Sequence, residues 1–185
     1  MSRIGRKPVT VPAGVDIKFA GGLLTVKGPK GQLTQTIKAG VSFKTENGQA
    51  VVERSDDTKA LRSLHGLYRA LLANMIAGVT AGYERTLRIV GTGYRVELKG
   101  TALEVTAGYC HPVKFAAPAG ITFELPKSNS REYMDFTVKG IDRQKVMETA
   151  AQLRKIRPPD LYQGKGIRYL DETPRRLEGK SFGSA

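Results

Sequence analysis

The chain has 185 residues, of which 30 are Lys or Arg and 17 are Asp or Glu, so its formal net charge is +13. This length fits one large domain or two small ones, and a hydrophobic content of 40% supports packed cores and argues against global disorder. Such a positive excess predicts a polyanionic partner. The chain lacks tryptophan and a basic amphipathic helix with aromatic anchors, which favours nucleic acid over a membrane surface.

The sequence gives no sign of export or membrane insertion. Its first residues are basic, and no apolar run follows them, so we expect no signal peptide. No stretch is apolar for the length of a transmembrane helix. Cys110 is the single cysteine and cannot form an internal disulfide, which fits the reducing cytoplasm.

The first half of the chain predicts short strands followed by one helix. Extended structure is expected at residues 24–26, 40–43 and 50–53, with a glycine-bearing turn after the first of these segments. Asp57 is the expected N-cap of the helix, and Gly78 and Gly82 mark its end. Apolar residues then recur at spacings of three and four, which predicts one buried face made of Leu61, Leu64, Tyr68, Leu71 and Met75.

The second half repeats this order of elements. Alternating residues at 86–89 and 94–98 predict antiparallel hairpins, and further strands are expected at 103–105, 120–123 and 136–138. A second helix follows Asp142, with an apolar stripe made of Val146, Ala150, Leu153 and Ile156. We therefore expect an α+β protein with two duplicated domains, each a small antiparallel sheet packed with one helix. The expected boundaries are 1–82, 83–169 and a C-terminal tail at 170–185, which carries three basic and three acidic side chains.

Positive charge is concentrated near the end of the second domain. Residues 139–169 contain only three acidic side chains against eight basic ones, namely Lys139, Arg143, Lys145, Arg154, Lys155, Arg157, Lys165 and Arg168. Such a run often forms a solvated face. Because this one continues into a glycine-rich loop, we favour a surface that binds RNA.

The loop at residues 159–169 has the composition expected of a phosphate-binding segment. Glycine lets a backbone approach a bulky anion, Lys and Arg supply charge, and tyrosine offers a ring or a hydroxyl to a base or sugar. The candidate contacts here are Tyr162, Gly164, Lys165, Gly166, Arg168 and Tyr169, preceded by Arg154, Lys155 and Arg157. A solvated basic loop, with Tyr169 packed in the core, remains the alternative.

Catalytic and metal-binding patterns are not found in the sequence. His65 lies within the predicted first helix, where a packing or hydrogen-bonding role is expected. Cys110 and His111 are adjacent on an extended segment, so their side chains point in opposite directions. A phosphate-binding P-loop ending at Gly164 would need glycine where Pro159 stands. We therefore predict no catalytic residue, no metal, no cofactor and no small-molecule substrate.

Several segments together resemble one family, the bacterial large-subunit ribosomal protein six. They run in order along the chain: residues 1–5, 26–31, 62–67, 74–79, 93–95, 108–113 and 159–169. The family usually has lysine where Gln163 stands and commonly has serine where Cys110 stands. The tail from residue 170 has no match, so its role is open.

The resemblance implies a structural protein that binds large-subunit ribosomal RNA, mainly through its second domain. It places the protein in the cytoplasmic ribosome beside neighbouring ribosomal proteins at the stalk base, near the subunit interface and the factor-binding and tRNA region. Further candidate contacts are Lys139 and a basic N-terminal arm with Arg3, Arg6 and Lys7, followed by Lys27 and Lys30. The residues alone leave open a free RNA- or DNA-binding regulator and an enzyme acting on nucleic acid.

Overall fold

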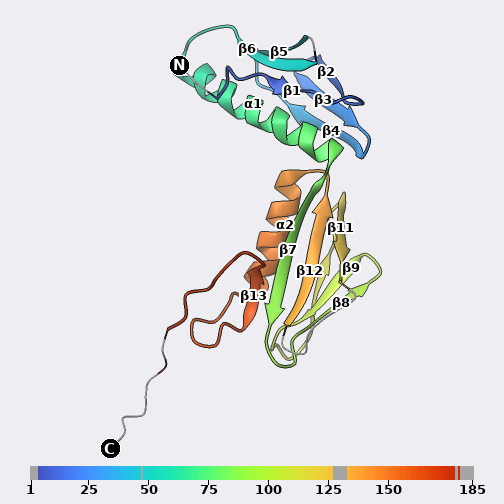
Figure 1. The fold of residues 1–185 in the computed structure, drawn as a ribbon, viewed down its shortest axis with the longest axis vertical. Helices are drawn as coiled ribbons and strands as arrows, with labels where there is room; N and C mark the ends of the chain where they lie inside the picture. Colours follow the sequence, from blue (N-terminus) through green and yellow to red (C-terminus); the bar gives the residue numbers. More distant parts are fainter. Residues whose placement is uncertain (1–3, 47, 127–132, 178, 180–185) are drawn as a thin grey trace, which may run out of the picture. The chain divides into compact units, whose positions relative to one another are not determined.

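A computed structural model describes residues 4–46, 48–126, 133–177 and 179 of the chain. The chain folds into two compact units, each with its own helix and sheets (Figure 1). The N-terminal unit comprises Met1–Tyr83 and Ile141–Arg143, and the C-terminal unit comprises Glu84–Gly140 and Gln144–Ala185.

The N-terminal unit packs one long helix, α1, against two antiparallel sheets of three strands each, in the orders β1-β6-β5 and β2-β3-β4. Its elements are β1 (Val9–Thr10), β2 (Asp16–Ala20), β3 (Leu23–Gly28), β4 (Gly31–Thr36), β5 (Val41–Glu46), β6 (Gln49–Arg54) and α1 (Lys59–Thr80). Leu24 and Val26 of β3 and Leu72 and Val79 of α1 are fully buried between them. These apolar contacts hold the helix on the sheets.

Helix α1 differs in two details from its prediction. Its N-cap is Thr58, whose side chain accepts a hydrogen bond from the amide of Leu61, whereas Asp57 forms an ion pair of 2.7 Å with Arg54. The prediction of Asp57 as the cap is therefore wrong by one residue. The buried face is also rotated: Tyr68 and Met75 are buried as expected, but Leu72, Ile76 and Val79 join them, while Leu61, Leu64 and Leu71 are only partly buried.

His65 has the packing role expected of it. The side chain is 5% exposed, and its Nε2 donates to the carbonyl of Val52 at 2.9 Å. Its Nδ1 lies 3.2 Å from the guanidinium of Arg54, which donates to it. Gly5 packs against the ring so closely that a Cβ there would lie within 2.8 Å of it. Both ring nitrogens therefore hold β6 on α1, and the ring packs against the N-terminal segment at Gly5.

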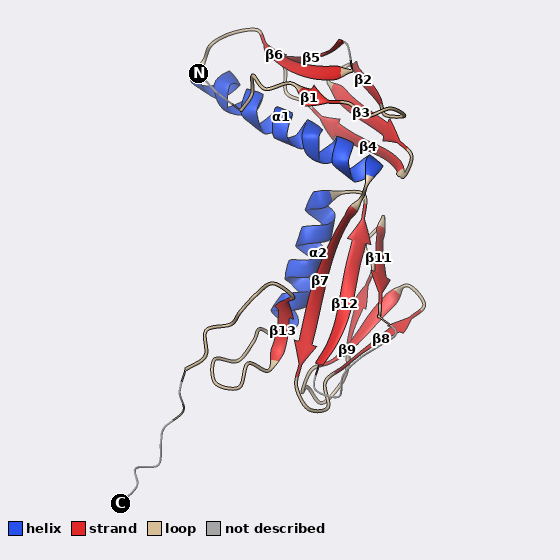
Figure 2. Cartoon of the chain, in the orientation of Figure 1, coloured by secondary structure: helices blue, strands red, loops and turns tan. Residues whose placement is uncertain are grey.

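The C-terminal unit repeats this plan (Figure 2). Its elements are β7 (Tyr83–Val90), β8 (Arg95–Lys99), β9 (Ala102–Thr106), β10 (Val113–Ala116), β11 (Ile121–Glu124), β12 (Tyr133–Gly140), α2 (Arg143–Ile156) and β13 (Gly166–Tyr169). One sheet has the order β10-β9-β8 and the other β11-β12-β7-β13. Val146, Ala150 and Leu153 of α2 are buried as predicted, while Ile156 is only partly buried and Thr149 takes a buried position.

The expected α+β fold class is confirmed, with one difference in its details. Each unit contains two sheets where one was expected, because β2-β3-β4 and β8-β9-β10 separate from the strands that flank them in the chain. The order β1-β6-β5 in the first unit corresponds to β7-β12-β11 in the second. Among the described residues, β13 has no counterpart in the N-terminal unit. It is the addition that distinguishes the second repeat, and it carries the predicted loop.

Candidate nucleic-acid interface

The predicted loop is fixed at its base to the rigid part of the C-terminal unit. It leaves α2 at residue 157 and returns as β13, which pairs antiparallel with β7 in the register Ile167 to Ile89. The amide of Ile167 donates to the carbonyl of Arg157 at 2.7 Å, and Ile167 is fully buried. The amide of Asp160 donates to the carbonyl of Lys165 at 2.8 Å. These bonds close the loop across its neck, so its tip is held in a defined shape.

Asp160 shapes the tip of the loop. Its carboxylate accepts hydrogen bonds from the amides of Gln163 at 2.9 Å and Tyr162 at 3.2 Å. These bonds, the one from Gln163 first, hold the pKa of Asp160 below its ordinary value. The amide of Gly164 donates to the backbone carbonyl of Asp160 at 3.0 Å. The N–H of Gly164 is therefore used within the turn.

The two glycines of the loop are required by the chain itself. Gly164 has a φ of +72°, in the left-handed region that glycine favours. Gly166 has a φ of +143°, and a Cβ there would lie 2.6 Å from the carbonyl oxygen of Pro158. Both glycines are buried. Gly166 therefore allows a close approach to the backbone of Pro158, and Gly164 allows one to the side chain of Arg176.

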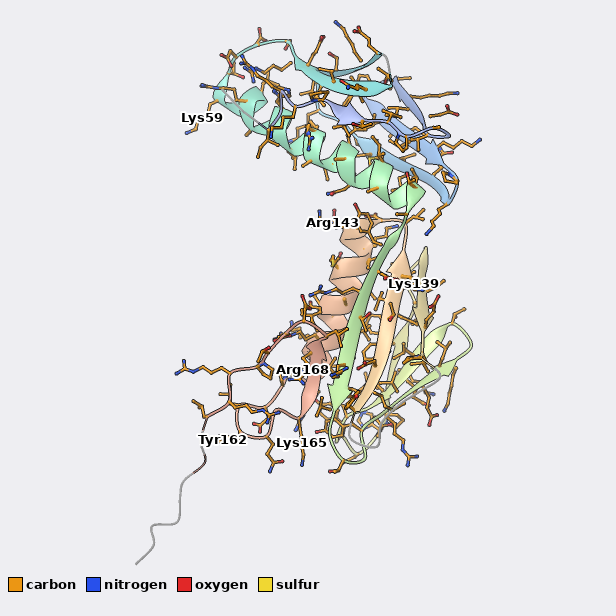
Figure 3. All side chains as sticks on the ribbon, viewed as in Figure 1. Lys59, Lys139, Arg143, Tyr162, Lys165 and Arg168 are labelled. Atoms are coloured by element: carbon orange, nitrogen blue, oxygen red, sulfur yellow. The ribbon has the colours of Figure 1, made fainter. Side chains whose placement is uncertain are left out.

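The loop presents a mixed aromatic and basic surface. The side chain of Tyr162 is 60% exposed and that of Leu161 53% exposed. Lys155 is exposed on the last turn of α2, and Lys165 is half-buried beside the turn. Among the residues that the structure describes, neither lysine forms an ion pair. Figure 3 shows Tyr162, Lys165 and Arg168 at one end of the C-terminal unit.

Arg157 is held in place by a second loop that the sequence reasoning did not connect to this site. Its guanidinium lies 5.5 Å from the centre of the Tyr109 ring, and hydrogen bonds to Tyr109 first, and also to Tyr94, raise its pKa. The hydroxyl of Tyr109 donates to the carbonyl of Ile156 at 2.8 Å, at the end of α2. The only sequence signal was the glycine turn at Gly108, which does not reveal contacts so distant in the chain.

Arg154 and Tyr169 are engaged inside the unit. Arg154 forms two hydrogen bonds with the carboxylate of Glu172, through Nε at 2.8 Å and Nη2 at 2.5 Å. The Tyr169 ring lies 4.4 Å from the guanidinium of Arg85 and 5.8 Å from that of Arg154. Both residues were predicted to contact RNA. Their positions suit support of the loop and of the segment that follows it.

Lys139 lies apart from the loop, toward the other end of β12 (Figure 3). Its ammonium is 2.6 Å from Glu124 and 3.8 Å from Glu84, and the hydrogen bond with Glu124 raises its pKa. The structure therefore does not bring Lys139 together with the other predicted contacts.

Arg168 lies on β13 directly opposite Arg88, which is itself paired with Asp135 at 2.7 Å. Its Nε is buried and has no hydrogen-bond partner among the described residues. Arg88 and Arg168 are thus neighbours on adjacent strands, and Arg88 binds its carboxylate partner on its other side, on β12. Glu172 also interacts electrostatically with Arg168. The Nε of Arg168 that lacks a partner suits an anionic ligand.

The remaining predicted contacts belong to the N-terminal unit and are distant in sequence from the loop at residues 157–169. Arg3 lies outside the described residues, and Arg6 and Lys7 are exposed. Lys27 is exposed on β3, whereas the ammonium of Lys30 donates to the carbonyl of Ala81. Lys30 therefore neutralises the negative end of α1, which has no basic residue in its own last turn.

Metal-binding clusters and membrane-spanning helices are both absent from the described part of the chain. Within residues 4–46, 48–126, 133–177 and 179, no cluster of His, Cys, Asp or Glu side chains is arranged to hold a metal ion. Cys110 and His111 are both exposed. No described helix has both the length and the apolar character needed to span a bilayer.

Comparison with known proteins points to one family. The family model described as Ribosomal protein L6 matches residues 11–82 and 90–170, and so covers most of both units. Two relatives named "Large ribosomal subunit protein uL6", from Caldicellulosiruptor bescii and Caldicellulosiruptor saccharolyticus, are each 51% identical to the chain over 181 residues. Each alignment covers 98% of this chain and 97% of the relative. These matches confirm the family that the sequence segments suggested.

Proposed function

Because the chain belongs to the ribosomal protein L6 family, we propose that it binds large-subunit ribosomal RNA mainly through the loop surface of its C-terminal unit. The chain is a structural, non-enzymatic component of the large ribosomal subunit, and bacterial ribosomes are cytoplasmic. We place its binding site near the stalk base, the subunit interface and the factor-binding and tRNA region, beside other ribosomal proteins there. The family resemblance supports this finer placement.

The observation that carries the proposal is the cationic loop surface, defined here as Lys155, Arg157, Tyr162, Lys165 and Arg168. These side chains come from α2, β13 and the loop between them, and the loop is closed by backbone bonds at its neck. The ordered backbone of this loop loses little conformational entropy when it binds. Folded RNA presents phosphates at fixed spacings, so cations carried on an ordered backbone can select one RNA shape.

The other predicted contacts take different parts in this proposal. Gly164 and Gly166 give the loop its shape, and Arg154 and Tyr169 hold its surroundings. Lys139 and the N-terminal Arg6 and Lys7 would act as separate, weaker contacts, and the predicted contact Arg3 lies outside the described residues. Phosphate contacts of this kind position a protein on RNA without reading bases.

Binding across a salt series tests the proposal. The full chain is compared on a large-subunit rRNA fragment that includes the factor-binding loop and on an RNA duplex of equal length. If about six phosphates are contacted, the logarithm of affinity falls against the logarithm of salt with a slope of roughly −4 to −5. The preference for the fragment should persist at physiological salt, and the double variant Lys165→Ala, Arg168→Ala should reduce the slope by about two and weaken the preference.

A matched control comes from the other sheet of the same unit. Arg95 and Lys114 are exposed, and the variant Arg95→Ala, Lys114→Ala removes the same charge from β8 and β10. This sheet control should retain the affinity and the slope of the parent chain. Equal affinity for fragment and duplex, lost together as salt rises, would show only a generic polycation and would contradict the proposal.

A further inference from the structure

The segment at residues 171–177 is an ordered part of the C-terminal unit that lies beyond the match to the family model, which ends at residue 170. Asp171 is bound by the guanidinium of Arg85 at 2.8 Å. The amide of Leu177 donates to the carbonyl of Leu161 at 2.8 Å, at the tip of the RNA-facing loop. The segment therefore starts at the end of β13 and runs back to the loop.

Glu172 fastens this segment near its start. Its carboxylate binds Arg154 through two hydrogen bonds and also accepts from the amide of Tyr169 at 3.2 Å. The hydrogen bond from Arg154 is the main reason why the pKa of Glu172 lies below its ordinary value. Two parallel bonds between a guanidinium and a carboxylate fix both groups in one plane. We call this arrangement of Arg154, Tyr169 and Glu172 the Glu172 clamp.

The segment carries two arginines toward the loop. Arg175 and Arg176 are both exposed, and neither has a carboxylate partner among the described residues. The guanidinium of Arg176 packs on the loop backbone, since a Cβ on Gly164 would lie 3.1 Å from its Nε and Nη2. Gly164 directly precedes Lys165. Arg176 therefore adds a cation immediately beside one of the proposed phosphate contacts.

We propose that residues 173–177 form a second strip of the RNA-binding surface, in which Arg175 and Arg176 bind phosphates and the Glu172 clamp positions them. This inference rests on the proposed function and extends it to a segment with no assigned role. Arginine suits such a strip because its planar fork can donate two hydrogen bonds to one phosphate. Arg154 and Glu172 are positioning residues in this scheme, since their polar groups are occupied by each other.

The variant Arg175→Ala, Arg176→Ala in the full chain tests the strip. Each lost phosphate contact should reduce the slope of log affinity against log salt by roughly 0.9, so on the rRNA fragment the slope should decrease by about two. Affinity for the fragment at 0.1 M salt should fall by about one to two orders of magnitude. The sheet control, Arg95→Ala with Lys114→Ala, should leave both values unchanged. Unchanged affinity and slope in the arginine variant would overturn the inference.

The variant Glu172→Gln tests the clamp, because a pure charge effect and a positioning effect predict opposite changes in RNA affinity. Removing a negative charge close to a polyanion should strengthen binding if Glu172 acts only through its field. If the clamp positions the arginines, affinity should instead fall about fivefold, because the ordering of the segment must then occur on binding. The fall should disappear when Glu172→Gln is combined with Arg175→Ala, Arg176→Ala, as a double-mutant cycle reveals. Tighter binding by Glu172→Gln would overturn the positioning role.

The outcomes separate this inference from the function on which it rests. A parent chain that prefers the rRNA fragment, together with an arginine variant that matches it, contradicts only the second strip. A parent chain with no preference contradicts the proposed function and the inference together. A cooperative thermal transition in each variant shows that the C-terminal unit remains folded, and only Glu172→Gln, which weakens the clamp, should lower the Tm slightly.

Discussion

Replacing Lys155, Arg157 and Lys165 together by alanine should lower affinity for the rRNA fragment about 500-fold at 0.1 M salt. Each phosphate contact contributes roughly 0.9 to the salt slope, which corresponds to about eightfold in affinity between 1 M and 0.1 M salt. The three side chains lie on one loop surface, and Lys155 and Lys165 have no ion-pair partner among the described residues. The measurement is equilibrium binding over a salt series, in which the slope should decrease by two to three.

The salt dependence distinguishes lost contacts from a disturbed fold. The loss of affinity should shrink as salt rises and nearly vanish at 1 M, because counterion release no longer favours binding there. A variant that had lost the shape of the loop would bind more weakly at every salt concentration with the slope preserved. The sheet control measures how much affinity is lost when two positive charges are removed elsewhere in the same unit. A triple variant that binds within twofold of the parent chain would exclude these residues from the interface.

Gly166→Ala should destabilise the C-terminal unit by about 2–6 kcal/mol. The backbone of Gly166 has a φ of +143°, which residues other than glycine rarely adopt. Forcing alanine into this conformation costs roughly 1–3 kcal/mol. The added Cβ would also lie 2.6 Å from the carbonyl oxygen of Pro158 and 2.8 Å from the Cα of Pro159, and such crowding costs about 1–3 kcal/mol. Because backbone atoms form this contact, a rotamer change cannot relieve it. Denaturant unfolding, followed separately for each unit, measures the loss.

Gly100→Ala is the matched control for this substitution. Gly100 also has a positive φ, of +64°, but a Cβ added there would meet no heavy atom within 4 Å. Its substitution should therefore cost only the backbone strain, about 1 kcal/mol. Equal stability of the two variants would show that the neck of the loop is free to relax. In that case the loop would lack the rigidity that is needed to select one RNA shape.

The parts of the fold that follow from local periodicity were predictable. Apolar spacings of three and four place α1 and α2, and alternation places strands such as β7 and β8. The burial of His65 followed from its position within a helix. The N-cap of α1 was missed by one residue, because Asp57 and Thr58 are both good caps and Arg54 captures the aspartate.

Contacts between distant residues were not predictable from the sequence. Arg154 and Glu172 are both ordinary surface residue types, and only the fold brings them into a bidentate pair. The same holds for Arg157 and Tyr109, which meet because the end of α2 lies beside the turn at Gly108. The sequence identified Gly164 and Gly166 as important for the loop, but it did not show which atoms come close to them. A glycine admits any close neighbour, and the sequence does not say whether that neighbour is RNA or Pro158.

Lysine footprinting tests most directly whether the cationic loop surface binds RNA. The full chain is treated with an amine-reactive reagent, free and bound to the rRNA fragment, and modification of each lysine is measured by peptide mass spectrometry. Lys155 and Lys165 should be strongly protected in the complex, while Lys114, on the other sheet of the same unit, should react equally in both states. Protection of Lys114 with continued reaction of Lys155 and Lys165 would place the RNA on a different surface and contradict the account.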